Sequence, residues 1–210
     1  MVNRSDRPAA RRQRWPRLIG SVLILAVACG LGGCGVVLLG GAAVGASTLY
    51  DRRPPQVVID DQRIELAALQ ALKQDPELSG QVRISATSYN LTVLLTGQAD
   101  SADAARQASR LVSRLPRVQR VVDEVTVGPR RDLARESQDV YITSRAKLVL
   151  TQVDLPGFDP TRVKVVTDSG VVYLMGLVSE DEADASAEQI RYIPGVERVV
   201  KLFEYRDQDG

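Results

Sequence analysis

The chain of 210 residues contains no histidine and only two cysteines, Cys29 and Cys34, which both lie near its start. Without histidine, it lacks the side chain that most often serves as a general acid or base near neutral pH. It also lacks a glycine-rich phosphate loop and the D-x-D-x-D-G spacing of a calcium-binding loop. The sequence therefore predicts a protein that is not an enzyme, with no catalytic residues, no metal site and no cofactor.

A strong excess of one charge is also missing, because 27 Lys and Arg residues nearly balance 26 Asp and Glu residues. Six of these bases but only one of these acids lie in residues 1–33. Without that segment, the chain has 21 bases and 25 acids, which gives a net charge of −4. Nucleic acids bind to basic surfaces, so this composition argues against a nucleic-acid partner.

The start of the chain has the pattern of an export signal. Residues 1–17 are rich in arginine, Leu18–Ala28 is almost entirely apolar, and Leu31-Gly32-Gly33-Cys34 follows. This order resembles a bacterial lipoprotein signal, in which a leucine and two small residues precede an acylated cysteine. The resemblance implies that residues 1–33 are removed and that Cys34 is lipidated. Because no Asp follows the cysteine, it also implies sorting to the outer membrane, with the protein facing the periplasm.

An uncleaved transmembrane anchor is the alternative to a lipoprotein signal. Leu18–Tyr50 contains no charged residue, and about 20 apolar residues are enough to span a bilayer. Both alternatives leave the arginines in the cytoplasm and export the rest of the chain. In the lipidated form, residues 34–60 are expected to be a flexible tether between the lipid and the folded part.

Two segments of the remaining chain repeat each other. Val93-Leu94-Leu95-Thr96-Gly97 matches Val172-Tyr173-Leu174-Met175-Gly176, and Leu115–Val122 matches Ile193–Val200. The distance along the chain between the matched segments is longer than the period of a solenoid repeat, which is about 20–50 residues. The repeat therefore predicts two copies of a small domain. We expect the first domain at residues 61–128, a linker at 129–136 and the second domain at 137–206.

Each copy has the same predicted order of helix, two strands, helix and strand. The expected helices are residues 61–74, 102–115, 139–152 and 180–193. The expected strands are residues 82–88, 92–96, 118–127, 163–167, 171–175 and 196–205. The predicted fold class is α+β, with two tandem αββαβ domains that each place two helices on one face of a three-stranded mixed sheet. We expect each domain to have its own core and to unfold separately, with the linker cleaved first by proteases.

The second copy carries the most specific family pattern. Val171–Val178 and Asp139–Thr143 resemble the BON domain (bacterial OsmY and nodulation), and the whole chain resembles outer-membrane lipoproteins with two BON domains. This resemblance implies phospholipid binding and a role in envelope integrity. Where the family pattern often has Trp in the first helix of the second domain, this chain has Tyr141.

A comparison of the two first helices predicts a lipid-binding face. Four apolar residues align between the copies and predict the core stripe, namely Ile64, Ala68, Ala71 and Leu72 with Ile142, Ala146, Val149 and Leu150. Outside that stripe, Tyr141, Arg145 and Leu148 share a second face, which Lys147 flanks. Apolar groups beside cations suit the surface of an anionic bilayer, so we predict that these four residues bind anionic phospholipid.

Other interpretations of these residues stay open. One alternative is that Tyr141 and Leu148 pack against the first domain or the linker. A separate alternative for the whole chain is a lipid-anchored docking module for an envelope assembly or cell-wall partner. The linker arginines, Arg130, Arg131 and Arg135, either meet phosphate or are solvated. Two glycines, Gly97 and Gly176, either line a binding site or serve the bend between strand and helix. The acidic residues Glu180, Asp181, Glu182 and Asp184 are expected to cap a helix.

Overall fold

The computed structural model describes residues 51–129 and 131–206. Cys34, the predicted signal and most of the predicted tether lie outside these residues. Within the part that is described, no helix is both long enough and apolar enough to cross a membrane. The described residues fall within one compact unit, which contains both repeats.

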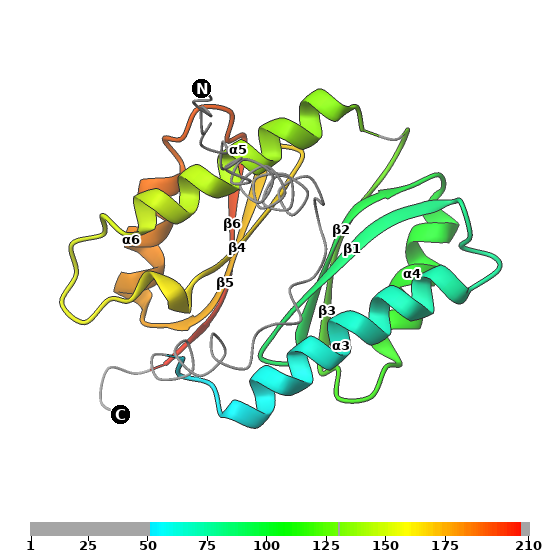
Figure 1. The fold of residues 1–210 in the computed structure, drawn as a ribbon, viewed down its shortest axis with the longest axis horizontal. Helices are drawn as coiled ribbons and strands as arrows, with labels where there is room; N and C mark the ends of the chain where they lie inside the picture. Colours follow the sequence, from blue (N-terminus) through cyan, green and yellow to red (C-terminus); the bar gives the residue numbers. More distant parts are fainter. Residues whose placement is uncertain (1–50, 130, 207–210) are drawn as a thin grey trace, which may run out of the picture. The chain divides into compact units, whose positions relative to one another are not determined.

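The first repeat is a three-stranded sheet with two helices (Figure 1). Its elements are α3 (Pro55–Gln74), β1 (Val82–Tyr89), β2 (Thr92–Ala99), α4 (Ala102–Ser113) and β3 (Arg120–Val127). The strand order is β1-β2-β3, with β1 antiparallel and β3 parallel to the central β2. Figure 1 shows α3 and α4 on the same face of this sheet.

The second repeat has the same topology. Its elements are α5 (Leu133–Leu150), a short 3-10 helix η1 (Pro160–Arg162), β4 (Lys164–Asp168), β5 (Val171–Val178), α6 (Glu180–Ile190) and β6 (Arg198–Tyr205). The strand order is β4-β5-β6, again with one antiparallel and one parallel pair. The predicted fold class of two tandem αββαβ units, each with a mixed sheet and two helices on one face, is confirmed.

The hydrophobic core of each repeat lies between its sheet and its helices. In the first repeat, Ile64, Ala68 and Leu72 of α3 pack with Val93 and Leu95 of β2. In the second repeat, the corresponding residues of α5 and β5 form a separate cluster, which includes Ile142, Ala146, Leu150, Val172 and Leu174. These buried residues confirm three of the four aligned positions of the predicted core stripe. The fourth position, Ala71 and Val149, is only partly buried.

Both first helices start earlier than expected. The first begins at Pro55 rather than residue 61, because a proline at this position has the backbone angle of a helix and gives up no hydrogen bond. The second begins at Leu133 rather than residue 139, because the Asp132 side chain accepts a hydrogen bond from the Arg135 amide and caps the helix. Parts of the predicted tether and linker are therefore helical.

Helix α6 begins as predicted. Ser179 accepts a hydrogen bond from the Glu182 amide, and the Glu182 carboxylate accepts one from the Ser179 amide, which together form a capping box. Burial by itself would raise the pKa of Glu182, but hydrogen bonds from Arg52 and from the Ser179 amide hold it below its ordinary value. The Arg52 bond, at 2.6 Å, joins the segment before α3 to the second repeat.

A buried aspartate holds the turn between the first two strands of each repeat. In the first repeat, Asp61 accepts hydrogen bonds from the amides of Asn90 and Leu91, which both have positive φ. In the second repeat, Asp139 accepts them from the amides of Ser169 and Gly170. The two aspartates are 78 residues apart and therefore equivalent.

An arginine from the preceding segment pairs with each of these aspartates. Arg53 lies 2.6 Å from Asp61, and Arg131 lies 2.8 Å from Asp139. Arg131 also lies 3.1 Å from Asp168. The same ion pair is thus built twice, eight residues ahead of the aspartate in each case.

The two repeats share a third hydrophobic cluster, formed by the sheet faces that point away from the helices. Tyr89 and Leu94 of the first repeat lie in one cluster with Tyr173 and Met175 of the second. Tyr173 also donates a hydrogen bond to Glu124, at 3.1 Å. The expected separate core of each repeat is confirmed, and each repeat also covers apolar surface of the other. Separate unfolding stays a prediction.

The two glycines near the ends of the central strands both allow close packing, and Gly97 also has a positive φ of 119° that favours glycine. A Cβ on Gly97 would lie 2.0 Å from the Arg83 carbonyl oxygen, and one on Gly176 would lie 2.6 Å from the Arg162 carbonyl oxygen. Both distances are far shorter than a real contact, so only glycine lets the neighbouring chain approach this closely.

Candidate functional site

Helix α5 carries the residues that the sequence predicts to bind lipid, and it leaves two of them exposed. Tyr141 is 50% exposed and Leu148 is 49% exposed. Neither belongs to a core cluster among the described residues. Half of each side chain is therefore accessible, and both lipid contact and packing against the first repeat or the linker stay predictions.

Two further apolar side chains extend this exposed face. Leu133 is 76% exposed and Val140 is 66% exposed. At roughly 100° per residue, Leu133, Val140, Tyr141 and Leu148 fall within an arc of about 100° on the side opposite the core. We call these four residues the α5 apolar face. Leu133 and Val140 were not predicted as part of this face, because the prediction rested on the positions near Tyr141 that differ between the two first helices.

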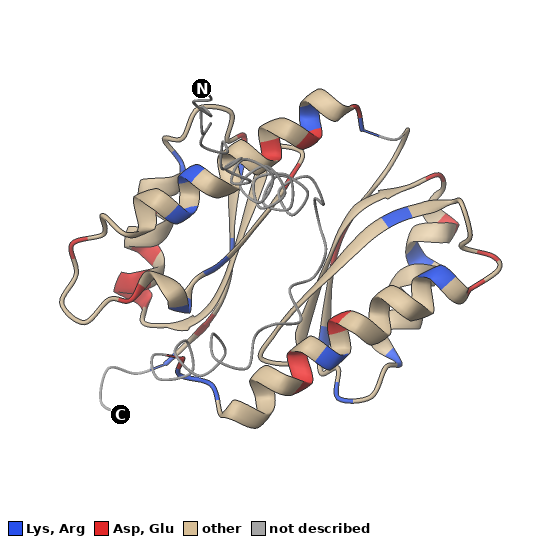
Figure 2. Cartoon of the chain, viewed as in Figure 1, with Lys and Arg blue, Asp and Glu red and all other residues tan. Residues whose placement is uncertain are grey.

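Two cations flank the α5 apolar face, one on each side. By the same geometry, Arg145 lies next to Tyr141 and Lys147 lies on the side of Val140. Within residues 51–129 and 131–206, no hydrogen bond or ion pair holds either cation. Figure 2 shows acidic residues toward the start of α5 and basic residues toward its end. The second half of α5 therefore presents apolar and cationic groups together.

Helix α3 also has an exposed apolar stripe, at other positions than those of α5. Ile59, Leu66 and Leu69 are all exposed and share one side of the helix. Arg63 and Lys73 lie on the same side, but Arg63 is within 3.8 Å of Asp60. Each repeat therefore has an exposed apolar stripe on its first helix, at different positions.

The linker arginines are held by acids where the structure describes them. Arg131 pairs with Asp139 and Asp168, and Arg135 pairs with Glu197 at 2.7 Å. Arg130 lies outside the described residues. Contact of Arg131 or Arg135 with phosphate would require these pairs to break, so they are weak candidates for a lipid site.

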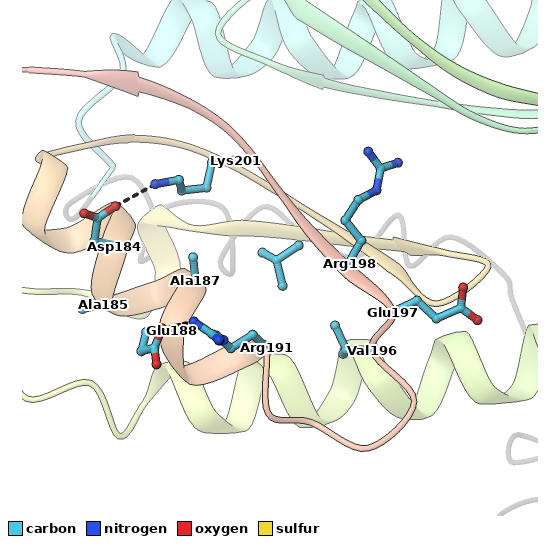
Figure 3. Close-up of a pocket in the computed structure, with 10 residues that line it drawn as sticks. Asp184, Ala185, Ala187, Glu188, Arg191, Val196, Glu197, Arg198 and Lys201 are labelled. Atoms are coloured by element: carbon cyan, nitrogen blue, oxygen red, sulfur yellow. Dashed lines mark hydrogen bonds and ion pairs between the residues drawn. The ribbon is translucent and has the colours of Figure 1, made fainter.

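A groove of about 830 Å³ lies between α6 and β6 (Figure 3). Its charged lining residues are three acids and three bases, namely Asp184, Glu188, Glu197, Arg191, Arg198 and Lys201. Lys201 pairs with Asp184 at 2.7 Å and Arg191 pairs with Glu188 at 2.9 Å. The groove is therefore largely neutralised by its own residues and favours neither an anion nor a cation.

No group of three or more potential metal ligands occurs in the described part of the chain. The titratable groups with clear pKa shifts have structural causes. Burial and the neighbouring Glu124 raise the pKa of Tyr173. Burial also raises the pKa of Asp168, although the charge of Arg131 acts in the opposite direction. Both groups lie in the packing between elements.

The architecture and the α5 face define a class of protein, namely a tandem of two small αββαβ domains with an exposed amphipathic helix. The model of the BON domain matches residues 60–129 and 138–207, which correspond to the two repeats. The chain therefore belongs to the BON-domain family.

Known relatives agree with this assignment. The chain is 33% identical over 186 residues to the outer membrane lipoprotein DolP of Haemophilus influenzae, covering 88% of this chain and 95% of that protein. It is also 33% identical over 156 residues to the 21 kDa hemolysin of Actinobacillus pleuropneumoniae, covering 74% and 79%. It is thus a homologue of an outer membrane lipoprotein.

Among solved structures, the chain matches the C-terminal domain of CdsD, a structural protein of the type III secretion system of Chlamydia trachomatis. The match has a TM-score of 0.24 and 12% identity, and it covers 68% of this chain and 96% of that one. A structural match with so low a TM-score gives no information about function.

Proposed function

We propose that this protein is a lipoprotein of the outer membrane that faces the periplasm and is anchored through Cys34. Its second repeat binds anionic phospholipid through the α5 apolar face and the two flanking cations, and this binding supports the integrity of the envelope. The protein acts by binding, not by catalysis. The observation that carries the proposal is the set of four exposed apolar side chains on one helix, between two cations that have no partner in residues 51–129 and 131–206.

The expected affinity of this face is low. A Lys or Arg near an anionic membrane surface contributes about 1 kcal/mol, so Arg145 and Lys147 together contribute about 2 kcal/mol. The apolar side chains add to this by entering the interface. Weak binding is sufficient, because an acyl anchor keeps the domain at a high local concentration beside the membrane.

Co-sedimentation with vesicles tests the proposal on the fragment 44–210, which contains both cores. The fragment should bind vesicles with phosphatidylglycerol better than vesicles of phosphatidylcholine alone. Tyr141→Asp with Leu148→Asp should abolish this binding while circular dichroism shows an unchanged fold. High salt should weaken wild-type binding only in part, since the apolar contribution is not screened.

The exposed stripe of α3 provides the matched control. Leu66→Asp with Leu69→Asp makes the same change in charge and apolar area on the equivalent helix of the first repeat. This variant should bind vesicles like the wild type. The proposal fails if the folded α5 variant still binds, or if the α3 variant loses binding to the same extent.

The second candidate function is docking to an envelope protein, and the α3 stripe favours it. The α3 stripe contains Ile59, Leu66 and Leu69 but no aromatic residue. One of its flanking cations, Arg63, lies near Asp60. This stripe is therefore less suited to an anionic surface than the α5 apolar face. A docking module would not distinguish anionic from neutral vesicles. The vesicle comparison therefore separates the two functions.

A further inference from the structure

Each three-stranded sheet has two edge strands, which have a neighbouring strand on one side only. The four edges are β1 and β3 in the first repeat and β4 and β6 in the second. The free backbone groups of an edge pair readily with another strand, so proteins usually shorten, cover or charge such edges. The four edges of this chain differ in how well they are protected.

Three of the four edges are protected. On β1, the Ser88 amide donates to the Glu65 carboxylate at 2.8 Å, and the Ser88 carbonyl accepts a bond from Lys164 at 3.1 Å. On β3, the Asp123 carboxylate accepts a hydrogen bond from the Val125 amide at 3.1 Å. Strand β4 has five residues and is therefore a short edge.

The edge of β6 is open. The Arg206 amide donates to the Val178 carbonyl at 3.1 Å, and alternate residues of a strand bond to the same neighbour. The amides and carbonyls of Val199, Lys201 and Phe203 therefore point away from β5. In residues 51–129 and 131–206, no backbone–backbone hydrogen bond uses them on that side.

The two repeats differ at the residue that protects this edge. Lys201 of β6 is equivalent to Asp123 of β3, which lies 78 residues earlier. A lysine ammonium accepts no hydrogen bond, so Lys201 cannot cap the Phe203 amide as Asp123 caps the amide two residues after it. The Lys201 ammonium lies 2.7 Å from Asp184 of α6 instead. Duplication of the domain alone therefore does not explain the open edge.

The groove between α6 and β6 leaves room beside this edge (Figure 3). Val199 and Lys201 line it from β6, and Ala187 is among the residues that line it from α6. When a strand is added to an open edge, backbone hydrogen bonds provide affinity and contacts of alternate side chains provide specificity. The edge of β6 therefore has the geometry that accepts a further strand.

The charges of β6 match those of a second, antiparallel β6. When Lys201 lies opposite Lys201 of the second copy, Arg198 of each copy lies opposite Glu204 of the other. Opposite charges that face each other directly stabilise an antiparallel pair. A shift of two residues in either direction loses this match, because Arg198 then faces Leu202 or Arg206. The charges thus select one register.

The apolar residues of β6 match in the same register. Val199 faces Phe203 of the second copy on the side of the helices, and Val200 faces Leu202 on the side of the first repeat. Val199, Val200 and Leu202 are only partly buried. A second strand would cover their remaining apolar surface, which is favourable. The backbone groups that point away from β5 also meet each other in this register.

Two features oppose this pairing, and neither prevents it. Lys201 meets its own copy, but each ammonium is paired with an aspartate of α6, so no net charge gathers there. Arg198 lies 3.5 Å from Glu124 and is 59% exposed, and such exposed pairs contribute little. A guanidinium has five N–H groups, so Arg198 can also contact Glu204 of the second copy. The main attraction comes from the backbone groups, which have no competing partner strand.

We infer that this protein forms a symmetric dimer through antiparallel pairing of β6 with β6 of a second copy. The two sheets of the second repeats then become one sheet, with the order β4-β5-β6-β6-β5-β4. The interface uses the same surface on both copies, as a two-fold axis requires. This inference goes beyond the proposed function and does not rest on it.

The dimer is compatible with attachment of both copies to one membrane. The two-fold axis of an antiparallel pair is perpendicular to the sheet, so the helices of both second repeats lie on the same side. Both α5 apolar faces then point in the same direction. A weak dimer is sufficient, because anchored copies have a high effective concentration beside the membrane.

Sedimentation velocity of the fragment 44–210 without lipid tests the inference. We expect a reversible dimer with a Kd of about 1 mM or tighter, the effective concentration that short tethers provide. Arg198→Glu should weaken the dimer at least about tenfold, because like charges then face each other twice. Arg198→Glu with Glu204→Arg should restore the wild-type affinity.

The variants control for each other. Both contain Arg198→Glu, so the lost contact with Glu124 cannot explain a difference between them. Arg120→Glu makes the same change at the equivalent exposed position of β3 and should leave the dimer unchanged. Circular dichroism checks the fold of all three variants.

Amide hydrogen exchange locates the interface. As the concentration of the fragment rises, the amides of Val199, Lys201 and Phe203 should exchange more slowly, because the second strand accepts their hydrogen bonds. The amides of Val121 and Asp123 on β3 should exchange equally at all concentrations.

Four results would overturn the inference. One is a fragment that stays monomeric up to about 1 mM, whether or not a strand of another protein binds this edge. The second is a dimer in which Arg198→Glu has no effect or the exchanged charges do not restore affinity. The third is unchanged exchange of the β6 amides on dimerisation. The fourth is loss of the dimer in Leu66→Asp with Leu69→Asp, which would place the interface on α3.

Vesicle binding distinguishes this inference from the proposed function. If a monomeric fragment binds anionic vesicles, the dimer inference fails and the proposed function stands. If the fragment forms the β6 dimer but does not bind anionic vesicles, the proposed function fails and the dimer stands.

Discussion

The packing of the two repeats against each other predicts different effects for two adjacent leucines of β2. Leu94 and Leu95 are both fully buried, but they point to opposite faces of the sheet. Leu95 lies in the core of the first repeat, whereas Leu94 lies in the cluster with Tyr173 and Met175 of the second. Leu94→Ala and Leu95→Ala thus remove the same atoms from the two sides of one strand.

Each substitution should lower the free energy of unfolding by about 2–5 kcal/mol, the range for Leu→Ala at fully buried sites. For a protein of this size, the melting temperature falls by roughly 2–4 °C per kcal/mol. Both variants should therefore melt roughly 4–20 °C below the wild type. The melting temperature alone does not distinguish them.

Amide hydrogen exchange distinguishes the two variants through β5, in the second repeat. Opening the second repeat breaks the shared cluster but leaves the core of the first repeat intact. Leu94→Ala should therefore lower the opening free energy of the β5 amides, and Leu95→Ala should leave it unchanged. Unchanged protection of β5 in Leu94→Ala would refute the reasoning that the shared cluster couples the repeats.

Other perturbations give further tests. Cys34→Ala should abolish incorporation of a fatty-acid probe in cells, and label that persists in the variant would rule out this anchor. Gly176→Ala should destabilise the protein by at least about 2 kcal/mol in urea unfolding, because its Cβ would meet the Arg162 carbonyl oxygen. Glu182→Gln should cost more stability at pH 7 than at pH 3. The pKa of Glu182 in the folded state is held below its ordinary value of 4.5, so its contribution is fully present above that value and is lost as the pH falls through the depressed pKa. Equal losses of melting temperature at both pH values would contradict this.

The fold could be predicted from the sequence because the two copies support each other. The apolar run before each central glycine, the serine caps at residues 101 and 179 and the aligned core stripe are all local patterns that recur in both repeats. Such patterns determine which residues form each helix and strand. Helix starts were less predictable, since Pro54-Pro55 is compatible with either an extended segment or a first helical turn.

The contact between the repeats was not predictable from these patterns. Leu94 and Tyr173 alternate with core residues, so the sequence shows that both faces of the strands are apolar. It does not show what covers the second face. The Arg52–Glu182 pair joins residues 130 positions apart, and no periodic pattern marks such a contact.

The candidate site was predictable only in part, because exposure depends on the tertiary structure. Tyr141, Arg145 and Leu148 differ between the copies, and this difference drew attention to α5. Leu133 was predicted to lie in the linker, before the expected start of the helix. No prediction therefore placed it on this face of α5.

The paired arginine and aspartate of each repeat have a consequence for the unit that was duplicated during evolution. Arg53 and Arg131 each lie seven residues ahead of the segments that match the BON-domain model, which begin at residues 60 and 138. Since both copies contain the pair, the ancestral unit included the arginine. A fragment cut at residue 60 or 138 would keep the buried aspartate and lose its guanidinium partner, which typically costs 3–5 kcal/mol. The inherited building block is therefore longer than the conserved domain, and its true first residue is at or before the arginine.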